Sequence, residues 1–178
     1  MKFINDKTHS YLSKLFVHEL RNAYIYQVIS SYLMTKGLTN FSLFFKERSR
    51  EEFKHAEWVR EFCEEKNILL NFGADIEGFE FTLPNMPISY FCQLAYNTEI
   101  ETNELWSIFY DMVYQDGNSR LFISLANKFM LEQNEETAWA SDLMDYAENL
   151  KDNVADWQKF DKNWDYSEYS SNYSDDDD

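Results

Sequence analysis

The chain contains few of the residues that interrupt helices or cross-link a fold. Its 178 residues include only four glycines, two prolines and two cysteines. So little glycine and proline excludes a many-stranded sheet with tight turns and predicts long helices. Cys63 and Cys92 stand apart, without a CxxC motif or a disulfide framework, which indicates a reducing environment. At this length we expect one domain with a substantial core.

Positive charge and long apolar runs are also scarce. The chain has 16 Lys and Arg residues against 32 Asp and Glu residues, a formal net charge of −16. This balance argues against a nucleic-acid partner, because phosphates would be repelled, and suits a protein that attracts cations. No segment approaches the roughly 20 apolar residues that span a bilayer, and the first residues do not resemble a secretory signal. The sequence therefore predicts a soluble cytoplasmic protein with no membrane partner.

The apolar residues that are present recur at helical spacing, which predicts an all-α fold. Gly37 marks the end of the first expected helix, and residues 116–118 (Asp-Gly-Asn) the end of the third. Residues 71–87 hold both prolines and break the pattern over a length that suits a crossover along a bundle. The second and third helices would then run parallel. The four helices of this bundle are expected at residues 10–36, 40–70, 89–115 and 119–150.

Each expected helix carries polar side chains in the middle of its apolar face. In the second helix, Glu52 and His55 are an i, i+3 pair, and Val59 and Phe62 continue their face toward the interior. Buried carboxylates are costly unless they are paired or bind a metal. In helix bundles, a Glu from one helix and a Glu-x-x-His from the next form half of a di-iron site. The residues expected to meet in the core are Glu19, Glu52, His55, Glu99, Gln133 and Glu136.

The alternative interpretation is a plain bundle whose glutamates face water. It fails for Glu19, Glu52 and Glu136, because their neighbours three, four and seven residues away are apolar or aromatic. One alternative to metal binding remains: Arg48 or Lys54 would partly neutralise the buried carboxylates. Solvent exposure is the default expectation for a second set of glutamates, namely Glu51, Glu57, Glu61, Glu64 and Glu65.

The donor types indicate which metal such a site would bind. Carboxylates with one imidazole and no thiolate favour iron or manganese over structural zinc. Tyr26 follows Glu19 by about two helical turns on the same face. It would hydrogen-bond a ligand or supply an electron, or else simply pack with its hydroxyl satisfied.

The four expected helices together resemble those of bacterial non-haem ferritins. Glu19 with Tyr26 and Gln27 resembles the first helix of that family, and the similarity extends over residues 8–148. Residues 37–45 together with 51–55 resemble the second helix of the family. Residues 96–99 resemble the third helix, and residues 132–136 resemble the fourth.

The resemblance implies a homo-oligomeric cage of about twenty-four subunits that oxidises Fe(II) with O2 or H2O2 and stores ferric mineral. Glu19, Glu52 and His55 would hold the first iron. Glu52 would bridge to a second iron held by Glu99 and Glu136. Gln133 would lie beside this second iron and Tyr26 beside the centre. A third, inward iron site would use Glu51, Glu132, Glu135 and Glu136.

The chain also departs from the resemblance in several places. Gln133 and Glu136 stand where bacterioferritins have a second Glu-x-x-His, and no Met is placed as a haem ligand, so no haem is expected. Lys128 occupies a position where bacterial members often have Trp. Residues 151–166 are expected to include a short fifth helix, more acidic and aromatic than is usual at a fourfold channel. Residues 167–178 are expected to form a disordered acidic tail beyond the bundle of residues 1–150.

Two other functions are compatible with the sequence. One is a ferritin-like oxidase or peroxidase that detoxifies iron or peroxide without storing mineral. The other is a structural or scavenging protein whose main role lies in binding a partner through the acidic tail.

Overall fold

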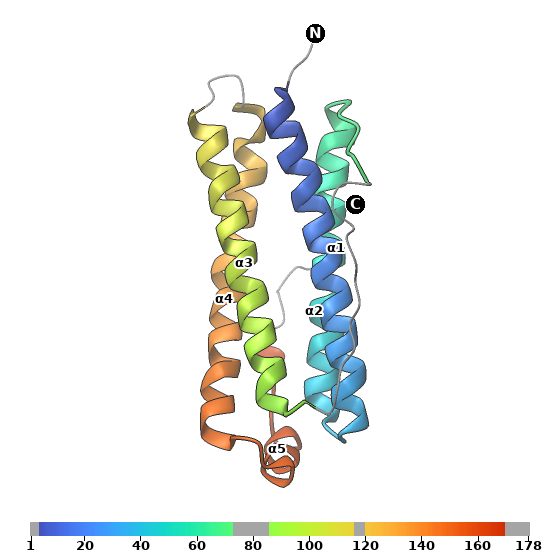
Figure 1. Cartoon of the computed structure of the whole chain (residues 1–178), viewed down its shortest axis with the longest axis vertical. Coiled ribbons are helices and arrows are strands. Elements are labelled where there is room, and N and C mark those ends of the chain that lie inside the picture. The colour runs from blue at the N-terminus through green and yellow to red at the C-terminus, as the bar shows by residue number, and fades with distance from the viewer. Residues whose placement is uncertain (1–3, 73–85, 116–119, 170–178) are drawn as a thin grey trace.

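The computed structural model describes residues 4–72, 86–115 and 120–169 (Figure 1). The described part of the chain is helical and contains no strand, as the sequence predicts. The elements in chain order are α1 (Asp6–Thr35), α2 (Thr39–Glu65), α3 (Ile88–Gln115), the 3-10 turn η1 (Arg120–Phe122), α4 (Ile123–Leu150), α5 (Val154–Asp161) and the 3-10 turn η2 (Ser167–Tyr169).

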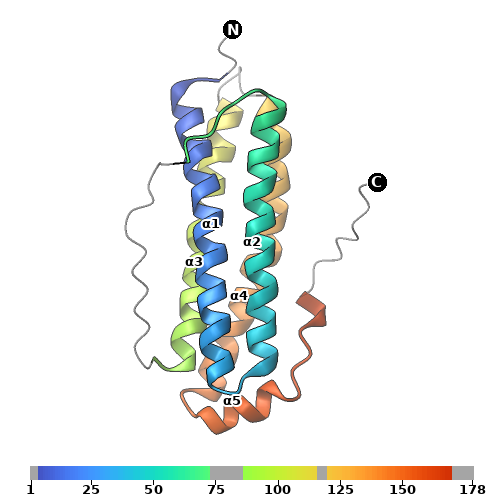
Figure 2. The same cartoon turned by 90° about the vertical axis from the view of Figure 1, so that its right-hand side faces the viewer.

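The four long helices form one bundle with two antiparallel pairs. α1 packs against α2, and α3 packs against α4 (Figures 1 and 2). α2 and α3 run in the same direction, which confirms the predicted up-down-down-up order. Most of the expected crossover, residues 73–85, lies outside the described residues, as do residues 116–119 between the third and fourth helices. This arrangement points one face of every helix at a common axis.

The turns that end α1 and α2 follow from single residues. Gly37 adopts φ +73°, which lets the Leu38 N–H reach back to the Leu33 carbonyl at 3.2 Å and close α1. Asn67 adopts φ 54°, and the Ile68 N–H bonds the Cys63 carbonyl at 2.8 Å in the same way. The predicted end of the second helix at residue 70 was therefore too late. Asn tolerates the left-handed conformation better than other non-glycine residues, so α2 already ends at Glu65.

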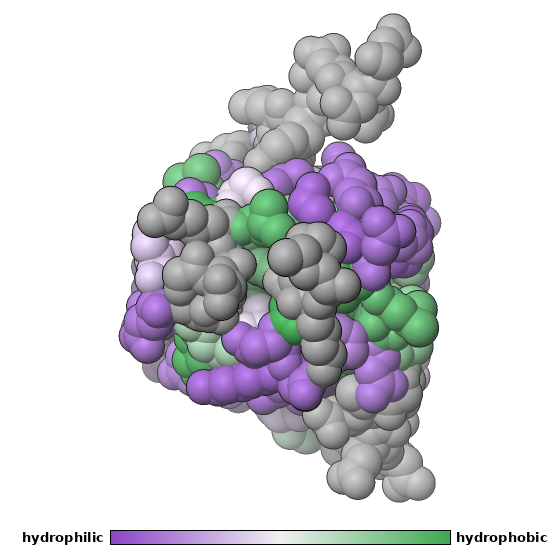
Figure 3. Space-filling view, turned by 90° about the horizontal axis from the view of Figure 1, so that it is seen from above, coloured by the Kyte–Doolittle hydropathy of each residue, from purple (hydrophilic) through white to green (hydrophobic). Residues whose placement is uncertain are grey.

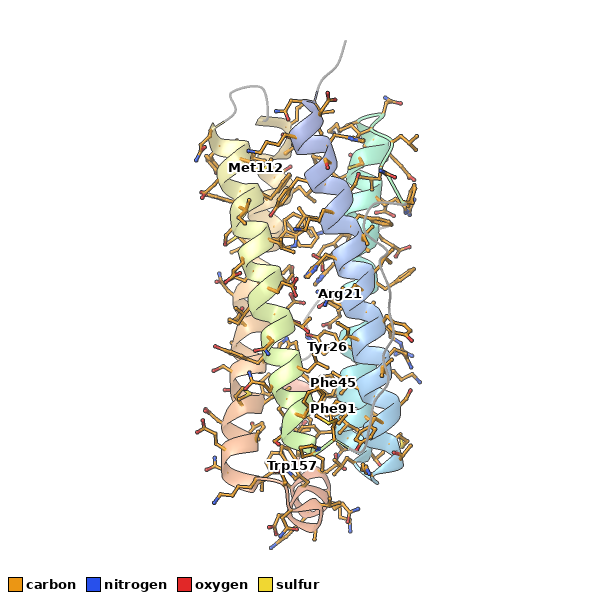
Figure 4. All side chains as sticks on the ribbon, viewed as in Figure 1. Arg21, Tyr26, Phe45, Phe91, Met112 and Trp157 are labelled. Carbon is orange, nitrogen blue, oxygen red and sulfur yellow. The ribbon has the colours of Figure 1, made fainter. Side chains whose placement is uncertain are left out.

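α5 lies across the end of the bundle where α1 meets α2 (Figure 2). Its Trp157 is fully buried at this end of the bundle (Figure 4), with its ring centroid 5.4 Å from that of Phe41 on α2. Asp161, also buried, accepts hydrogen bonds from the backbone N–H groups of Asn40 at 3.2 Å and Phe41 at 2.8 Å. Leu38 at the start of α2 makes no side-chain cap of its own. A residue from the C-terminal segment thus caps α2 and satisfies donors that would otherwise be orphaned.

The segment after α5 continues along α2 and α4 as far as the described residues extend. Trp164 is buried against Phe41 and Phe44, with ring centroids 4.2 and 5.3 Å apart. The first three residues of the expected disordered tail, Ser167–Tyr169, form η2 and pack on this face because Tyr169 is itself aromatic. Residues 170–178, which include the four terminal aspartates, lie outside the described residues.

The apolar core is divided into two clusters by a polar layer. On α1, one cluster contains Leu12, Leu15 and Phe16, whereas the other begins at Ile25. Buried polar residues Glu19 and Asn22 occupy the turns between them. The same interruption occurs on the other long helices, so a layer of polar side chains crosses the bundle about halfway along its length.

The outer surface is mixed in character. Seen along the bundle axis, hydrophilic residues surround smaller hydrophobic areas (Figure 3). Among the described residues, no helix combines the length and the apolar character that crossing a membrane requires.

Candidate metal centre

The polar layer consists of side chains from all four long helices. α1 contributes Glu19, α2 contributes Glu52 and His55, α3 contributes Glu99, and α4 contributes Gln133 and Glu136. All six are buried, with Glu19 and Glu99 fully inaccessible and none more than 4% exposed. The structure therefore brings together every residue that the sequence places in the expected di-iron core.

Two compact groups of potential ligands share one residue. Glu19, Glu52 and His55 each offer one ligand atom, and these atoms lie within 4.8 Å of one another. Glu52, Glu99 and Glu136 form a second such group within the same limit. Glu52 belongs to both groups, so its carboxylate lies where it could bridge two metal ions.

Several ligand atoms in this layer have no hydrogen-bond partner among the described residues. They are Glu19 Oε2, Glu99 Oε2 and His55 Nδ1, all of them fully buried. His55 Nδ1 lies 3.6 Å from Glu136 Oε1 and 3.8 Å from Glu52 Oε2, which is too far for a good hydrogen bond. Orphaned buried oxygens and imidazole nitrogens of this kind are the donors that a divalent cation would satisfy.

The electrostatics of the layer favour a cation. Burial raises the pKa of Glu19, Glu52 and Glu136 well above the ordinary value, and neighbouring carboxylates raise it further. Burial also raises the pKa of Glu99, to about 7, while its hydrogen bond from Tyr26 opposes the shift. The pKa of His55 is lowered by burial, which keeps the imidazole neutral and its nitrogen available as a ligand. Without a metal, burial and mutual repulsion therefore favour the protonated forms of these carboxylates.

Each carboxylate of the layer is held through one of its oxygens by a neighbouring donor. The Trp106 indole N–H donates to Glu19 Oε1 at 2.6 Å, and the Tyr26 hydroxyl donates to Glu99 Oε1. The Gln133 amide donates to Glu136 Oε2, and the Asn22 amide lies 3.5 Å from Glu52 Oε2. Such outer partners fix the orientation of metal ligands. Tyr26 is fully buried in the central part of the bundle, between α1 and α3 (Figure 4).

Asn22 is in turn held by a polar contact between α1 and α3. Its amide donates to Thr102 Oγ1 at 2.9 Å, and Thr102 donates to the Thr98 carbonyl at 2.8 Å. His18 Nε2 also lies 2.9 Å from Thr102 Oγ1. Because the Thr102 proton is already committed, His18 Nε2 must be the donor in this pair. Burial lowers the pKa of His18 to about 4, although Glu101 opposes the shift, so this histidine is neutral near pH 7.

The residues expected at a third iron site are more dispersed. Glu132 is buried, Glu135 is exposed, and Glu51 is partly exposed. Neither compact ligand group includes them, although Glu136 belongs to one. Arg48, one of two residues named as possible neutralisers of the core, pairs with Glu51 at 2.5 Å instead. Its guanidinium therefore lies beside the layer and does not form an ion pair with the core carboxylates.

The position of Lys128 is explained by an aromatic side chain from another helix. Lys128 Nζ lies 3.3 Å from the ring centroid of Trp58, on α2. The Trp58 ring is 4.9 Å from that of His55, so an indole does border the candidate ligand. Phe129 stacks on Trp106 with centroids 3.6 Å apart. The sequence pointed to position 128, but Trp58, which lies on the His55 helix one turn further along, was not predicted to border the centre.

Trp106 and Asn22 were likewise not predicted from the sequence as partners of the carboxylates. The available signal was their spacing: Trp106 follows Glu99 by two turns on the same face of α3, and Asn22 follows Glu19 by one turn of α1. This spacing places both donors at the level of the polar layer, but the carboxylates that they bond lie on neighbouring helices: Trp106 bonds Glu19, and Asn22 lies beside Glu52.

Fold and site together define a class of protein: an up-down-down-up four-helix bundle with a carboxylate-rich candidate di-metal centre in its core. A family model described as a ferritin-like domain matches residues 10–149. The chain therefore belongs to the ferritin-like domain family, which confirms the resemblance seen in the sequence. No match is found among curated proteins.

Solved structures show the same fold. One is described as a novel open-pore ferritin from the hyperthermophilic archaeon Archaeoglobus fulgidus, with a TM-score of 0.77, 23% identity, and coverage of 91% of this chain and 96% of that one. An engineered closed form of the Archaeoglobus fulgidus ferritin gives 0.76 at 23% identity, with 89% and 94% covered. A humanised archaeal ferritin gives 0.76 at 22%, with 89% and 95% covered.

Proposed function

We propose that this chain is a ferroxidase that detoxifies and stores iron by oxidising Fe(II) at the candidate metal centre. The observation that carries the proposal is the pair of compact ligand groups joined at Glu52, with orphaned donor atoms buried in both. A layer of carboxylates without balancing cations is costly in a protein core, and two Fe(II) ions would supply that charge.

The proposed roles follow from the two groups. Glu19, Glu52 and His55 hold one Fe(II), and Glu52 bridges to a second held by Glu99 and Glu136. Each Fe(II) gives one electron to O2 or H2O2. The carboxylates lower the cost of the additional positive charge on Fe(III), and the neutral imidazole leaves one ligand without charge. Tyr26 and Gln133 orient the carboxylates of the second position.

Oxidised iron would leave the centre past a third group of carboxylates. Glu51, Glu132 and Glu135 lie on the same two helices as Glu52 and Glu136, within one or two turns of them. We assign them to the passage of ferric iron toward a mineral store. The store would be the cavity of a cytoplasmic cage of about twenty-four copies, since closed symmetric assemblies of one chain are common. The likeness to an open-pore ferritin supports this assembly.

The first test is aerobic Fe(II) loading followed by size-exclusion chromatography, with protein and iron measured in the same fractions. We expect iron in large excess over the ligand sites, co-eluting with a particle far larger than the 21.4 kDa chain. Rapid oxidation with only a few irons retained on a small oligomer would contradict storage. That result would support an oxidase or peroxidase that detoxifies without mineral.

A further inference from the structure

A series of aromatic rings in contact leads away from the candidate centre. Tyr26, whose hydroxyl donates to Glu99, packs edge-on against Trp139 with ring centroids 5.9 Å apart. Trp139 contacts Phe44 at 5.3 Å, and Phe44 contacts Trp164 at 5.3 Å. Rings at these separations and angles are in van der Waals contact. The series passes through α1, α4 and α2 and ends in the segment that follows α5.

Tyr169 lies at the outer end of this series. Its ring centroid is 6.1 Å from that of Phe44 and 6.2 Å from that of Trp164. The Tyr169 hydroxyl donates to Asp142 Oδ2 at 2.9 Å and lies 3.2 Å from the Tyr146 hydroxyl. Tyr169 is partly exposed, whereas the rings between it and the centre are buried. The series therefore has one end at the candidate metal ligands and the other within reach of solvent.

The same pairing of chemical groups occurs at both ends. Oxidation of a tyrosine releases an electron and the phenolic proton, so it is easiest where a carboxylate can take that proton. Tyr26 has Glu99 as its acceptor, and Tyr169 has Asp142. Burial and the bond to Asp142 raise the pKa of Tyr169, so the proton is on the phenol at neutral pH.

The surroundings of the rings between the two tyrosines do not stabilise an oxidised state of those rings. The indole N–H groups of Trp139 and Trp164 have no hydrogen-bond partner among the described residues that could receive a proton. The Arg48 guanidinium lies 5.9 Å from the Trp139 ring and 5.3 Å from the Phe44 ring, which disfavours positive charge there. An oxidising equivalent that enters the series would therefore reside on a tyrosine at one end or the other.

Arg48 also fixes the outer tyrosine in place. Its Nη2 donates to the Tyr169 carbonyl at 2.9 Å while the same side chain pairs with Glu51. The C-terminal segment is thus held against α2 at the level of the aromatic series.

We propose that Tyr169, with Asp142 as its proton acceptor, is the surface terminal of a one-electron path to the metal centre. This inference rests on the proposed ferroxidase function. Tyr26 gives an electron to O2 or H2O2 at the centre and its proton to Glu99. An electron from Tyr169 then passes along the rings to Tyr26, which takes its proton back from Glu99, while the Tyr169 proton moves to Asp142. A one-electron donor in solution, Fe(II) or ascorbate, reduces Tyr169, which recovers its proton from Asp142.

Such a terminal would supply electrons that the metal centre lacks. Reducing O2 to water takes more electrons than a pair of Fe(II) ions supplies. The path would deliver the remainder from outside the bundle, and it would move the oxidising equivalent from the buried Tyr26 to a tyrosine within reach of solvent.

The test follows radical formation in the full chain. Fe(II)-loaded protein is mixed with oxygenated buffer. Samples are then frozen for electron paramagnetic resonance or trapped with a nitroso spin trap, and the adducts are located by peptide mass mapping. The variants are Tyr169→Phe, which keeps the ring, and Asp142→Asn, which keeps the tyrosine and removes only the proton acceptor. Tyr114→Phe serves as the control, because Tyr114 is 51% exposed near the end of α3 and its ring contacts that of Tyr110, which lies outside the series.

We expect wild type and Tyr114→Phe to carry an adduct on Tyr169. Both Tyr169→Phe and Asp142→Asn should lose it, and the radical at Tyr26 should then decay more slowly. An absent adduct at Tyr169 in wild type, or unchanged radical decay in both variants, would overturn the path. The initial rate of Fe(II) oxidation, recorded in the same samples, should be equal in all four proteins. Absence of Fe(II) oxidation in wild type would refute the proposed ferroxidase function, whereas oxidation without a Tyr169 radical would refute only the path.

Discussion

The two helix pairs of the bundle contribute three polar residues each to the centre, but the types of donor atom that they contribute differ. The α1–α2 pair supplies Glu19, Glu52 and His55, and it leaves the His55 Nδ1 atom without a hydrogen bond. In the α3–α4 pair the corresponding imidazole is missing, and the Gln133 amide already bonds Glu136. Each pair keeps one carboxylate oxygen without a partner, Glu19 Oε2 in the first and Glu99 Oε2 in the second, but only the first pair adds a neutral nitrogen ligand. We infer that the two candidate metal positions differ in affinity, with the one beside His55 being the stronger.

The largest expected effect comes from removing the residue that the two pairs share. Glu52→Gln should lower the initial rate of Fe(II) oxidation by at least about 100-fold. Losing a residue that only hydrogen-bonds a metal ligand costs up to about 100-fold, and losing the ligand itself should cost more. The measurement is stopped-flow absorbance after aerobic addition of Fe(II). Glu61→Gln, a matched change at an exposed position of the same helix, should leave the rate unchanged. An undiminished rate in Glu52→Gln would remove this carboxylate from the proposed site.

A second experiment compares metal binding by the α1–α2 pair with metal binding by the α3–α4 pair. His55→Ala should abolish binding at one of two Co(II) sites, because the ligand nitrogen is lost, whereas Gln133→Ala should keep both sites and weaken one by about tenfold. Calorimetric titration of the metal-free protein with Co(II) gives the number of sites and their affinities. Equal losses in the two variants would show that the imidazole of the first pair does not distinguish it from the second.

Smaller effects are expected from the donors that hold each carboxylate. Trp106→Phe removes the N–H that bonds Glu19, and Tyr26→Phe removes the hydroxyl that bonds Glu99. Each should weaken Co(II) binding by about tenfold, the first at the position with His55 and the second at the other. The Co(II) absorption spectrum reports which position has changed. If both substitutions change the same Co(II) absorption band, Trp106 and Tyr26 do not act at separate metal positions.

The mildest test concerns the pH dependence of stability in the metal-free protein. The pKa of Glu99 is raised from 4.5 to about 7 in the folded state, so its contribution to stability is present below pH 4.5 and is lost as the pH rises through 7. Glu99→Gln cannot ionise and should not show this loss. The difference in melting temperature between Glu99→Gln and wild type should therefore grow with pH. It should grow by roughly 2–4 °C for each kcal/mol of unfolding free energy that wild type loses. The neutral histidines His18 and His55 are common to both proteins and cancel in the comparison. A constant difference between pH 4.5 and pH 8 would contradict the shifted pKa.

Much of the site could be predicted from the sequence because it depends on spacing along single helices. Glu52 and His55 share a face at any α-helical geometry, and the apolar neighbours of Glu19 and Glu136 determine that those faces are buried. The partners that hold the carboxylates were harder to predict. The Trp106 bond to Glu19 joins residues 87 positions apart and depends on how far α1 and α3 are rotated toward each other. Periodicity contains no information about that rotation.

The fold shows the same division between local and distant determinants. The end of α1 at Gly37 is a local property and was predicted. The end of α2 at Glu65, which the left-handed Asn67 brings about, was missed because Asn adopts this conformation only in some contexts. The ordered turn at Ser167–Tyr169 depends on aromatic packing against Phe44 and on the tether from Arg48. Composition alone assigned these residues to a disordered tail.

The cap that Asp161 provides to α2 has a consequence for the order in which the molecule is completed. The Asp161 carboxylate and the Phe41 N–H that it accepts are 120 residues apart. A ribosome makes the chain from the N-terminus, so the start of α2 is synthesised long before its cap. Until residue 161 has emerged, the first turn of α2 has unpaired N–H groups, and the face of Phe41 that Trp157 and Trp164 will cover is open to solvent. Translation that stops short of this point therefore leaves a bundle with an unfinished end that proteases and chaperones can recognise.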